Sequence, residues 1–218
     1  MFSGIVSSIG IVNQIIRKNT GTVLTVQGGK GFFGFDSGES IAVNGVCLTV
    51  RDSTNDTFTV DLSSETLSRT CFENIEDRMN VNLERALTPS DKISGHFVSG
   101  HIDCVGKITS IDHKPGEIVF RFEYPVAYTP FIIEKGSIAV DGISLTTFSC
   151  LENGFSVSIV PFTFSNTNLA SREIGDLVNI ECDMIGKYIY KACETILLPD
   201  SEGKTKFLDI LRRQNILK

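Results

Sequence analysis

The sequence contains one short phrase twice, as VNGVCLTV at residues 43–50 and as VDGISLTT at residues 140–147. Four of the eight positions are identical, and the fifth position changes from Cys47 to Ser144. Cysteine and serine can both act as nucleophiles, so the two copies share a potentially reactive position but differ in its chemistry. The phrase therefore raises the prediction of a duplicated fold with two related but unlike sites.

Other blocks repeat in the same order, at an offset of 97 residues or, for the first block, 96. The matching pairs are FSGIV and VSGHI (2–6 and 98–102), FTVDLSSETLSRT and FSVSIVPFTFSNT (58–70 and 155–167), and VNLE and VNIE (81–84 and 178–181). Four blocks in one order at nearly one offset indicate a tandem duplication. A chain of 218 residues is long enough for two domains, because single domains usually have about 50–200 residues.

Composition excludes several classes of protein. The net charge is −6, and the basic residues are scattered, which argues against a surface that binds nucleic acid or an anionic membrane. No apolar run approaches the roughly 20 residues of a membrane-spanning helix, and the first residues lack the pattern of a secretion signal. We therefore expect a cytoplasmic protein. Its six cysteines have neither zinc-site nor CxxC spacing, so we expect reduced thiols and no bound metal.

Each repeat reads mostly as strand. The segments are short, rich in β-branched residues, roughly alternating, and bounded by Gly, Asn, Asp or Ser. In the first repeat they include 22–26, 40–50, 58–62 and 79–84, and five or six such strands are expected in each repeat. Such spacing predicts a small, nearly closed antiparallel barrel in each half, with short helices at 63–71 and 160–170. Residues 187–198 and 204–218 have helical spacing, and this helical segment packs either on its own barrel or on another subunit.

Matched polar residues suggest the kind of ligand. Thr49 and Thr146 recur, as do Thr66 and Thr163, and no glycine-rich phosphate cradle accompanies them. Neutral hydroxyls suit an uncharged heterocycle with a polyol chain better than a phosphate. The copies also differ in ways that would give two like molecules unlike roles. The differing pairs are Ile5 and His101, Asn44 and Asp141, and Cys47 and Ser144.

The segments MFSGIV, VNGVCLTV, SGHFVSGHID and DGISLT together resemble riboflavin synthase of the α-chain type, from Met1 to about residue 186. The resemblance implies a mainly β fold of two tandem six-stranded antiparallel barrels with a C-terminal helix, assembled as a homotrimer. It implies a transferase that dismutates two molecules of 6,7-dimethyl-8-ribityllumazine into riboflavin and 5-amino-6-(D-ribitylamino)uracil, without a cofactor. The expected domains are residues 1–95, residues 96–186 and a helical trimer contact at 187–218. A lumazine synthase shell is a possible partner.

The resemblance also implies substrate-binding residues in both barrels, and a site that forms between the N-terminal barrel of one subunit and the C-terminal barrel of its neighbour. For the N-terminal barrel they are Gly4, Ile5, Val6, Ser40, Cys47, Leu48, Thr49, Asp61, Leu62, Ser63, Ser64, Glu65 and Thr66. For the C-terminal barrel they are Gly100, His101, Ile102, Lys135, Ser144, Leu145, Thr146, Ser158, Ile159, Val160, Pro161, Phe162, Thr163 and Asp183.

Three residues are the catalytic candidates. The C7 methyl group of the lumazine is acidic, and the imidazole of His101 could remove its proton near neutral pH. Cys47 and Ser144 are the candidate nucleophiles, although Cys47 could also be a buried structural thiol. We expect Ser144 to act with His101, and Cys47 to serve the other substrate molecule. If residues 96–101 form a strand, His96 and His101 point to opposite faces.

Two features depart from the family pattern. Phe162 stands where an acidic residue usually follows the proline, and the C-terminal tail is longer. One alternative is a lumazine- or flavin-carrying protein with the same double barrel, but such relatives lose parts of the set Cys47, His96, His101 and Ser144, which is complete here. A barrel that binds oligonucleotides or sugars is disfavoured by the negative charge and by the lack of aromatic residues alternating with Lys or Arg.

Overall fold

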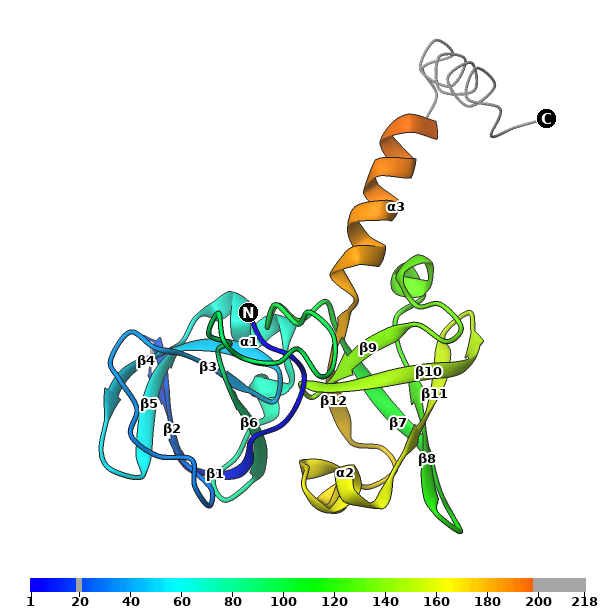
Figure 1. Ribbon diagram of the computed structural model, residues 1–218. Coiled ribbons are helices and arrows are strands. Elements are labelled where there is room, and N and C mark those ends of the chain that lie inside the picture. The colour runs from blue at the N-terminus through cyan, green and yellow to red at the C-terminus, as the bar shows by residue number, and fades with distance from the viewer. Residues whose placement is uncertain (19–20, 198–218) are drawn as a thin grey trace, which may run out of the picture. The chain divides into compact units, whose positions relative to one another are not determined.

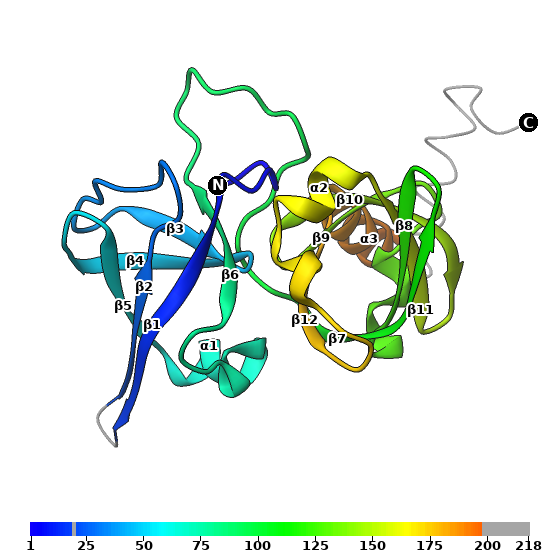
Figure 2. The same cartoon turned by 90° about the horizontal axis from the view of Figure 1, so that it is seen from below.

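The computed structural model describes residues 1–18 and 21–197, and its strands form two closed antiparallel barrels (Figure 1). The strands of the N-terminal barrel are β1 Ser8–Lys18, β2 Gly21–Gln27, β3 Ser40–Val43, β4 Val46–Ser53, β5 Thr57–Leu62 and β6 Asn80–Arg85. They follow the order β1-β2-β5-β4-β3-β6 around the barrel, which β1 and β6 close, as Figure 2 shows.

The C-terminal barrel repeats this arrangement. Its strands are β7 Cys104–Lys114, β8 Glu117–Glu123, β9 Ser137–Val140, β10 Ile143–Leu151, β11 Gly154–Ile159 and β12 Leu177–Cys182. Its closed order is β10-β11-β8-β7-β12-β9, which is the order of the first barrel with six added to each label. The prediction of two six-stranded barrels is confirmed.

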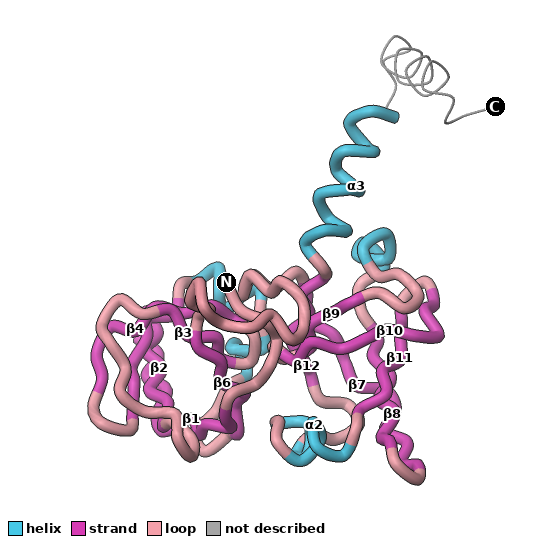
Figure 3. Tube along the Cα trace, viewed as in Figure 1, coloured by secondary structure: helices cyan, strands magenta, loops and turns pink. Residues whose placement is uncertain are grey.

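Short helical turns lie between the strands (Figure 3). They are α1 Ser64–Arg69 and η1 Cys71–Asn74 in the first barrel, and η2 Val126–Phe131, α2 Pro161–Ser165 and η3 Asn168–Ser171 in the second. Ser63 begins α1 as its N-cap, because its hydroxyl oxygen accepts a hydrogen bond from the backbone N–H of Thr66. In α2, Pro161 stands in the first turn, where its missing N–H costs nothing.

Alternation builds the core of each barrel. In β2 every second side chain, from Thr22 through Leu24 to Val26, is buried, which is what a strand with one face inside a barrel requires. Phe58, Leu83 and their neighbours form the N-terminal core, and a separate set around Phe120 and Phe155 forms the C-terminal core.

The two copies of the repeated phrase, at residues 43–50 and 140–147, form a contact between the two barrels. Asn44 and Gly45 both have positive φ, as do Asp141 and Gly142, so each pair makes the two-residue turn of a tight β-hairpin. Residues 40–50, which read as one segment, are therefore two strands. The turns touch: a Cβ atom on Gly45 would lie 2.6 Å from the backbone nitrogen of Gly142. Glycine is needed here for close approach as well as for its conformation.

A buried polar network surrounds these turns. Asn82 donates from its side chain to the backbone oxygen of Asp141, and Asn179 donates in the equivalent way to the backbone oxygen of Asn44. Asp141 is fully buried and pairs with Arg172 at 2.7 Å. The equivalent residues of the first repeat are Asn44 and Ile75, which carry no charge. The amide contacts therefore occur in both repeats, whereas the ion pair occurs only in the second.

Two extended segments connect the barrels. We call residues 2–6 the first strap and residues 98–102 the second strap. They pair with each other through Phe2 and Val98, which exchange hydrogen bonds at 2.7 and 3.1 Å. Val6 of the first strap packs on the C-terminal core, whereas Ile102 of the second strap packs on the N-terminal core. Each strap therefore covers the barrel of the other repeat.

The last described helix, α3 Met184–Leu197, belongs to a separate compact unit that begins at Met184. The helix begins three residues earlier than the expected residue 187, directly after Asp183, a residue type favoured at a helix start. The second helical segment expected at 204–218 lies outside the described residues. Among residues 1–18 and 21–197, no helix is both long and apolar enough to cross a membrane.

Candidate functional site

Each barrel has a pocket of about 350 Å³ beside its variant of the repeated phrase. We call the one in the N-terminal barrel the N-pocket. Its lining residues are Val46, Cys47, Ser63, Glu65, Thr66, Arg69, Thr70, Gly100, His101 and Ile102. The N-pocket thus combines one thiol, one imidazole and the exposed Glu65–Arg69 pair, whose nearest charged atoms are 3.9 Å apart.

The corresponding C-pocket lies in the C-terminal barrel. Its lining residues are Ile5, Ser94, Gly95, Ser137, Ser144, Leu145, Thr146, Ser158, Ile159, Val160 and Thr163. Six of these are hydroxyl residues and none is charged. Such a lining can make many hydrogen bonds to a neutral, hydroxyl-rich ligand, whereas it offers no countercharge to a phosphate.

The straps exchange pockets, which corrects the expected division of the site residues. Ile5 was assigned to the N-terminal barrel but lines the C-pocket, and His101 was assigned to the C-terminal barrel but lines the N-pocket. The backbone shows why: the N–H of Ser144 donates to the oxygen of Gly4 at 2.7 Å, and the N–H of Cys47 donates to Gly100 at 2.9 Å. Internal similarity locates a strap but does not reveal which of two similar barrels it covers.

Ser144 is paired with His96 and not with His101. The Oγ of Ser144 lies 2.7 Å from Nδ1 of His96, a hydrogen bond in which the tautomer decides the donor. Alternation along a strand does not apply to these histidines, because residues 96–101 form no strand beyond the single bridge at Val98. Within the single chain the hydrogen-bond partner of Ser144 is thus His96, while His101 lies in the N-pocket with Cys47. The predicted partnership of Ser144 with His101 would have to form between subunits.

Burial controls the electrostatics of His96. Burial lowers the pKa of its imidazole below the ordinary value of 6.5, and the nearby carboxylate of Asp183 opposes that shift. The imidazole is therefore mostly neutral at pH 7 and can accept a proton at one nitrogen. Its other nitrogen, Nε2, is buried and has no hydrogen-bond partner among the residues that the structure describes. An unpartnered buried nitrogen in a candidate site is a position where a ligand or water atom would be stabilised.

A glycine makes room for this pair. A Cβ atom on Gly95 would lie 2.9 Å from the Oγ of Ser144 and 2.2 Å from the backbone oxygen of Ser3. The backbone N–H of His96 donates to that same oxygen at 3.1 Å. The first strap and the segment before His96 therefore hold the pair from two sides.

Several predicted residues lie outside the lining of both pockets. Leu48 and Leu62 are buried in the N-terminal core, and Gly4 and Val6 contact Ser144 and the C-terminal core from the first strap. Ser40 and Thr49 face each other in the β3–β4 ladder. The remaining members of this group are Ser64, Asp61, Lys135, Pro161, Phe162 and Asp183.

Three of these have clear surroundings. Asp61 accepts a hydrogen bond from Arg51 at 2.6 Å in an exposed ion pair. The ammonium group of Lys135 lies 5.7 Å from the centre of the Phe148 ring. Phe162 is 77% exposed at the start of α2, next to the C-pocket residues Val160 and Thr163.

Sequence reasoning missed some pocket residues. They are Val46, Arg69 and Thr70 in the N-pocket, and Ser94, Gly95 and Ser137 in the C-pocket. The internal repeat carried one usable signal, since Ser137 occupies the position equivalent to Ser40. No comparable signal existed for Ser94 and Gly95, because they lie in the connection between the repeats. His96 was noted as one of three histidines, but nothing in the sequence linked it to Ser144.

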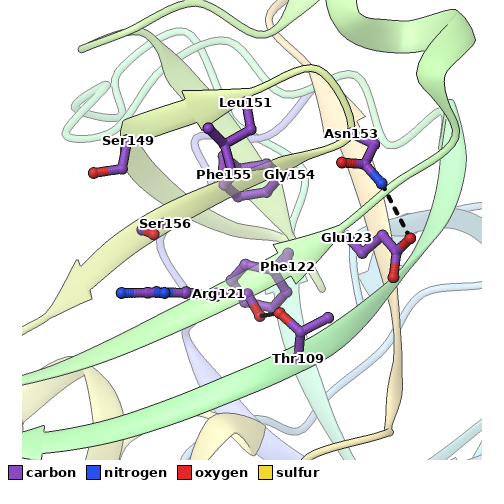
Figure 4. A pocket seen from close by; sticks show the side chains of 10 residues that line it. All are labelled: Thr109, Arg121, Phe122, Glu123, Ser149, Leu151, Asn153, Gly154, Phe155 and Ser156. Atoms are coloured by element: carbon purple, nitrogen blue, oxygen red, sulfur yellow. Dashed lines mark hydrogen bonds between the residues drawn. The ribbon is translucent and has the colours of Figure 1, made fainter.

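A further hollow of about 400 Å³ lies on β7, β8, β10 and β11 (Figure 4). It includes the buried rings of Phe122 and Phe155 and a hydrogen bond of 3.2 Å from Asn153 to Glu123. None of the predicted site residues lines it. We therefore place the candidate site in the N-pocket and C-pocket, where the repeated reactive positions lie.

Comparison with known proteins identifies the family to which both repeats belong. The family described as "Lumazine binding domain" matches residues 3–86 and again residues 99–183. Riboflavin synthase of Bacillus subtilis (strain 168) is 41% identical over 206 residues, 94% of this chain and 94% of that protein. Riboflavin synthase of Actinobacillus pleuropneumoniae is 42% identical over 216 residues, 98% of this chain and 99% of that protein.

Solved structures share the fold. A crystal structure of LumP complexed with 6,7-dimethyl-8-(1'-D-ribityl) lumazine has a TM-score of 0.76 at 23% identity, and one complexed with riboflavin has a TM-score of 0.78. Both cover 84% of this chain and 99% of that chain. The resemblance based on the repeated motifs is thus confirmed: the chain belongs to the riboflavin synthase family and carries the lumazine-binding domain twice.

Proposed function

We propose that this chain catalyses the dismutation of two molecules of 6,7-dimethyl-8-ribityllumazine into riboflavin and 5-amino-6-(D-ribitylamino)uracil. The observation that carries the proposal is the presence of two equivalent pockets with different reactive groups. The C-pocket is lined by Ser144, whose hydroxyl is hydrogen-bonded to His96, and the N-pocket is lined by Cys47 and His101. Two copies of one molecule can be bound by two similar pockets. Because one copy must donate and the other accept the transferred unit, the reactive side chains of the two pockets must differ.

The pockets suit this substrate in size and polarity. Their volumes of about 350 Å³ fall within the range of roughly 300–1,000 Å³ that is typical of small-molecule sites. The hydroxyls of the C-pocket would bind the ribityl chain and the pyrimidine edge. In the N-pocket, Ser63, Thr66 and Thr70 offer the same kind of group.

In the C-pocket, Ser144 and His96 would activate a nucleophile for carbon C7 of the bound lumazine. Neutral His96 accepts the proton of the Ser144 hydroxyl through Nδ1 as the oxygen attacks, or the pair orders a water molecule for the same attack. The lowered pKa of His96 keeps the imidazole in the required neutral form.

In the N-pocket, His101 would remove a proton from the C7 methyl group of the second lumazine. The proton passes to the imidazole, and the resulting anion is delocalised into the ring, ready to form a carbon–carbon bond with the first molecule. Cys47, whose side chain lines the same pocket, would contact the ring at the position that Ser144 occupies in the other barrel.

We extend the proposal to a homotrimer in which the N-pocket of one subunit faces the C-pocket of the next. Such a trimer would hold the two lumazine molecules next to each other. Their reaction is then faster than between two separate molecules, because they no longer have to meet in solution. The helix α3 is the proposed trimer contact, because Ile185, Tyr188 and Ile189 on it are each more than half exposed in the single chain. Large exposed apolar side chains of this kind mark association surfaces.

The test is to incubate purified protein with 6,7-dimethyl-8-ribityllumazine alone and to follow riboflavin by absorbance. We expect one riboflavin for every two lumazines consumed. The Ser144→Ala and His96→Gln variants should each lower kcat, by roughly 10²- to 10⁴-fold, as removal of an acid–base pair does. The control is His113→Gln, since His113 lines neither pocket.

A wild-type protein that binds the lumazine without forming riboflavin would contradict the proposal. The chain would then be a lumazine carrier on the same fold. If riboflavin forms but Ser144→Ala keeps full activity, the reaction stands and the assignment of Ser144 fails.

A further inference from the structure

Two buried glutamates hold the straps. Glu84 on β6 is 6% exposed, and Glu181 on β12 is 1% exposed; they occupy equivalent positions in the two repeats. A buried carboxylate is costly unless hydrogen bonds compensate for the water it has lost. The hydrogen bonds that each carboxylate accepts must therefore compensate for its burial.

The carboxylate of Glu84 binds the first strap with both oxygens. Its Oε1 accepts hydrogen bonds from the backbone N–H and the hydroxyl of Ser3, each at 2.7 Å. Its Oε2 accepts one from the N–H of Gly4 at 3.1 Å. Glu84 belongs to the N-terminal barrel, whereas the strap that it holds lines the C-pocket.

The contacts then continue to the reactive pair. The backbone oxygen of Ser3 accepts from the N–H of His96 at 3.1 Å, and the oxygen of Gly4 accepts from the N–H of Ser144 at 2.7 Å. One carboxylate thus fixes two consecutive carbonyl groups, each of which holds one member of the Ser144–His96 pair. Ser3 alone links Glu84 to His96, and Gly4 alone links Glu84 to Ser144.

Glu181 makes the equivalent contacts in the other repeat. It accepts from the N–H and hydroxyl of Ser99 at 2.7 and 2.6 Å, and from the N–H of Gly100 at 2.9 Å. The oxygen of Gly100 accepts from the N–H of Cys47, and His101 follows directly in the chain. A carboxylate of the C-terminal barrel therefore holds the strap that lines the N-pocket.

We propose that Glu84 and Glu181 are crossed positioning residues: Glu84 sets the geometry of Ser144 and His96 in the C-pocket, and Glu181 sets that of Cys47 and His101 in the N-pocket. Neither carboxylate is among the residues that line the N-pocket or the C-pocket, so each acts through its strap. The consequence for catalysis rests on the proposed lumazine dismutation. The crossed placement itself does not, because it concerns only contacts within the chain.

A carboxylate is needed because it only accepts hydrogen bonds. Glutamine at position 84 would place its NH₂ group toward the N–H of Gly4 or toward the N–H of Ser3, donor against donor. One backbone N–H of the strap would lose its acceptor in either orientation. The size and shape of the side chain stay the same, so Glu84→Gln and Glu181→Gln perturb the strap without leaving a cavity.

The experiment uses the full-length protein and the ring signals of its three histidines in NMR spectra. His113, on β7 and in edge contact with Phe164, is the internal reference. We expect Glu84→Gln to shift the signals of His96, while those of His101 stay in place. Glu181→Gln should shift His101 and leave His96 unchanged.

The opposite pattern, in which each variant shifts only the histidine that lies in the pocket of its own barrel, overturns the proposal. Equal shifts of all three histidines in both variants also overturn it, because they indicate general destabilisation. Ser3→Ala and Ser99→Ala provide a milder pair should the glutamine variants fail to fold. They remove one donor each, keep the carboxylates, and should give the same crossed pattern with smaller shifts.

Kinetics add a second readout. Each glutamine variant should lose roughly 10- to 100-fold in kcat with a smaller change in KM, since a displaced reactive group costs rate more than binding. Unchanged kcat in both variants would remove the catalytic part of the proposal. If the wild type forms no riboflavin, the proposed reaction fails, while the crossed NMR pattern still decides whether the two glutamates position the straps.

Discussion

At the scale of single residues, the C-pocket depends on a histidine that is held neutral. His96 is bonded to Ser144 through Nδ1, and burial disfavours its charged form. A histidine that remained charged at neutral pH could not accept the proton of a hydroxyl group. The burial that costs the protein some stability on acidification would thus also keep His96 in the neutral form that the proposed base requires.

Acidification should reveal the lowered pKa of His96 as a loss of stability. Its folded-state pKa lies below the unfolded value near 6.5, so its contribution is fully present above pH 6.5 and is lost as pH falls through the folded pKa. We expect urea unfolding to show that the wild type loses more stability than His96→Gln between about pH 7.5 and about pH 5.5. The difference is about 1.4 kcal/mol for each unit between the two pKa values.

Glu84 acts with the opposite sign but does not disturb this comparison. Burial raises its pKa, so its contribution is present below the unfolded value near 4.5 and is lost as pH rises through the folded value. The same residue is present in both proteins, and its effect cancels in their difference. An equal loss of stability in wild type and His96→Gln would show that His96 titrates normally.

At the scale of elements, the straps depend on close backbone contact. Gly100 has a φ of +84°, and a Cβ atom added to it would lie 2.5 Å from the Cβ of Cys47. Gly116, in the turn between β7 and β8, has the same φ of +84° but no atom within 4 Å of such a Cβ. Substituting alanine at Gly116 tests only the cost of the backbone conformation, whereas substituting it at Gly100 adds the cost of the clash with Cys47.

Gly116→Ala should cost about 1–2 kcal/mol of unfolding free energy, the ordinary penalty of left-handed backbone for a residue with a Cβ. We expect Gly100→Ala to cost more, and to impair riboflavin formation, because the second strap must move away from Cys47. Urea unfolding and activity assays on both variants make the comparison. Equal stability and full activity would mean that the strap tolerates displacement from the N-pocket.

The sequence predicted the elements well and the connections poorly. The repeated blocks carry the alternation and turn residues that specify strands, so the two barrels, and the equivalent places of Cys47 and Ser144 beside the two pockets, could be predicted. The crossing of the straps could not, because each strap meets similar backbone donors in either barrel. The His96–Ser144 contact spans 48 residues in sequence and depends on that crossing.

At the scale of the whole molecule, the contact between the barrels contains a buried ion pair that is surrounded by asparagine side chains and backbone amides. Asp141 is fully buried and Arg172 is mostly buried, with Asp176 only 4.0 Å from the guanidinium and more exposed. Loss of one partner of such a pair leaves an uncompensated charge, which costs more than the pair itself contributes.

Asp141→Asn should therefore destabilise the protein by about 3–5 kcal/mol, measured by urea unfolding. The double variant Asp141→Asn with Arg172→Ile recreates the combination of Asn44 and Ile75 in the first repeat. We expect it to recover much of the loss, since no charge is then left unpaired. A single variant as stable as the wild type would show that Asp176 alone compensates Arg172.

The proposed trimer makes a prediction about mixtures. His101→Ala damages the N-pocket and Ser144→Ala damages the C-pocket, so each variant alone should be nearly inactive. If a working site joins pockets of neighbouring subunits, refolding the two variants together should restore part of the activity. Mixtures that stay as inactive as the separate variants would place both substrates within one chain.

The exchanged straps also say something about descent. A single ancestral barrel had no second half in its own chain to seat its leading segment, so the crossing of residues 2–6 and 98–102 implies a pair of identical barrels that swapped these segments. Joining two copies of such a gene would turn that exchange between molecules into one within a molecule. Only then could Ile5 and His101, or Cys47 and Ser144, diverge, because a symmetric pair would have carried every change twice.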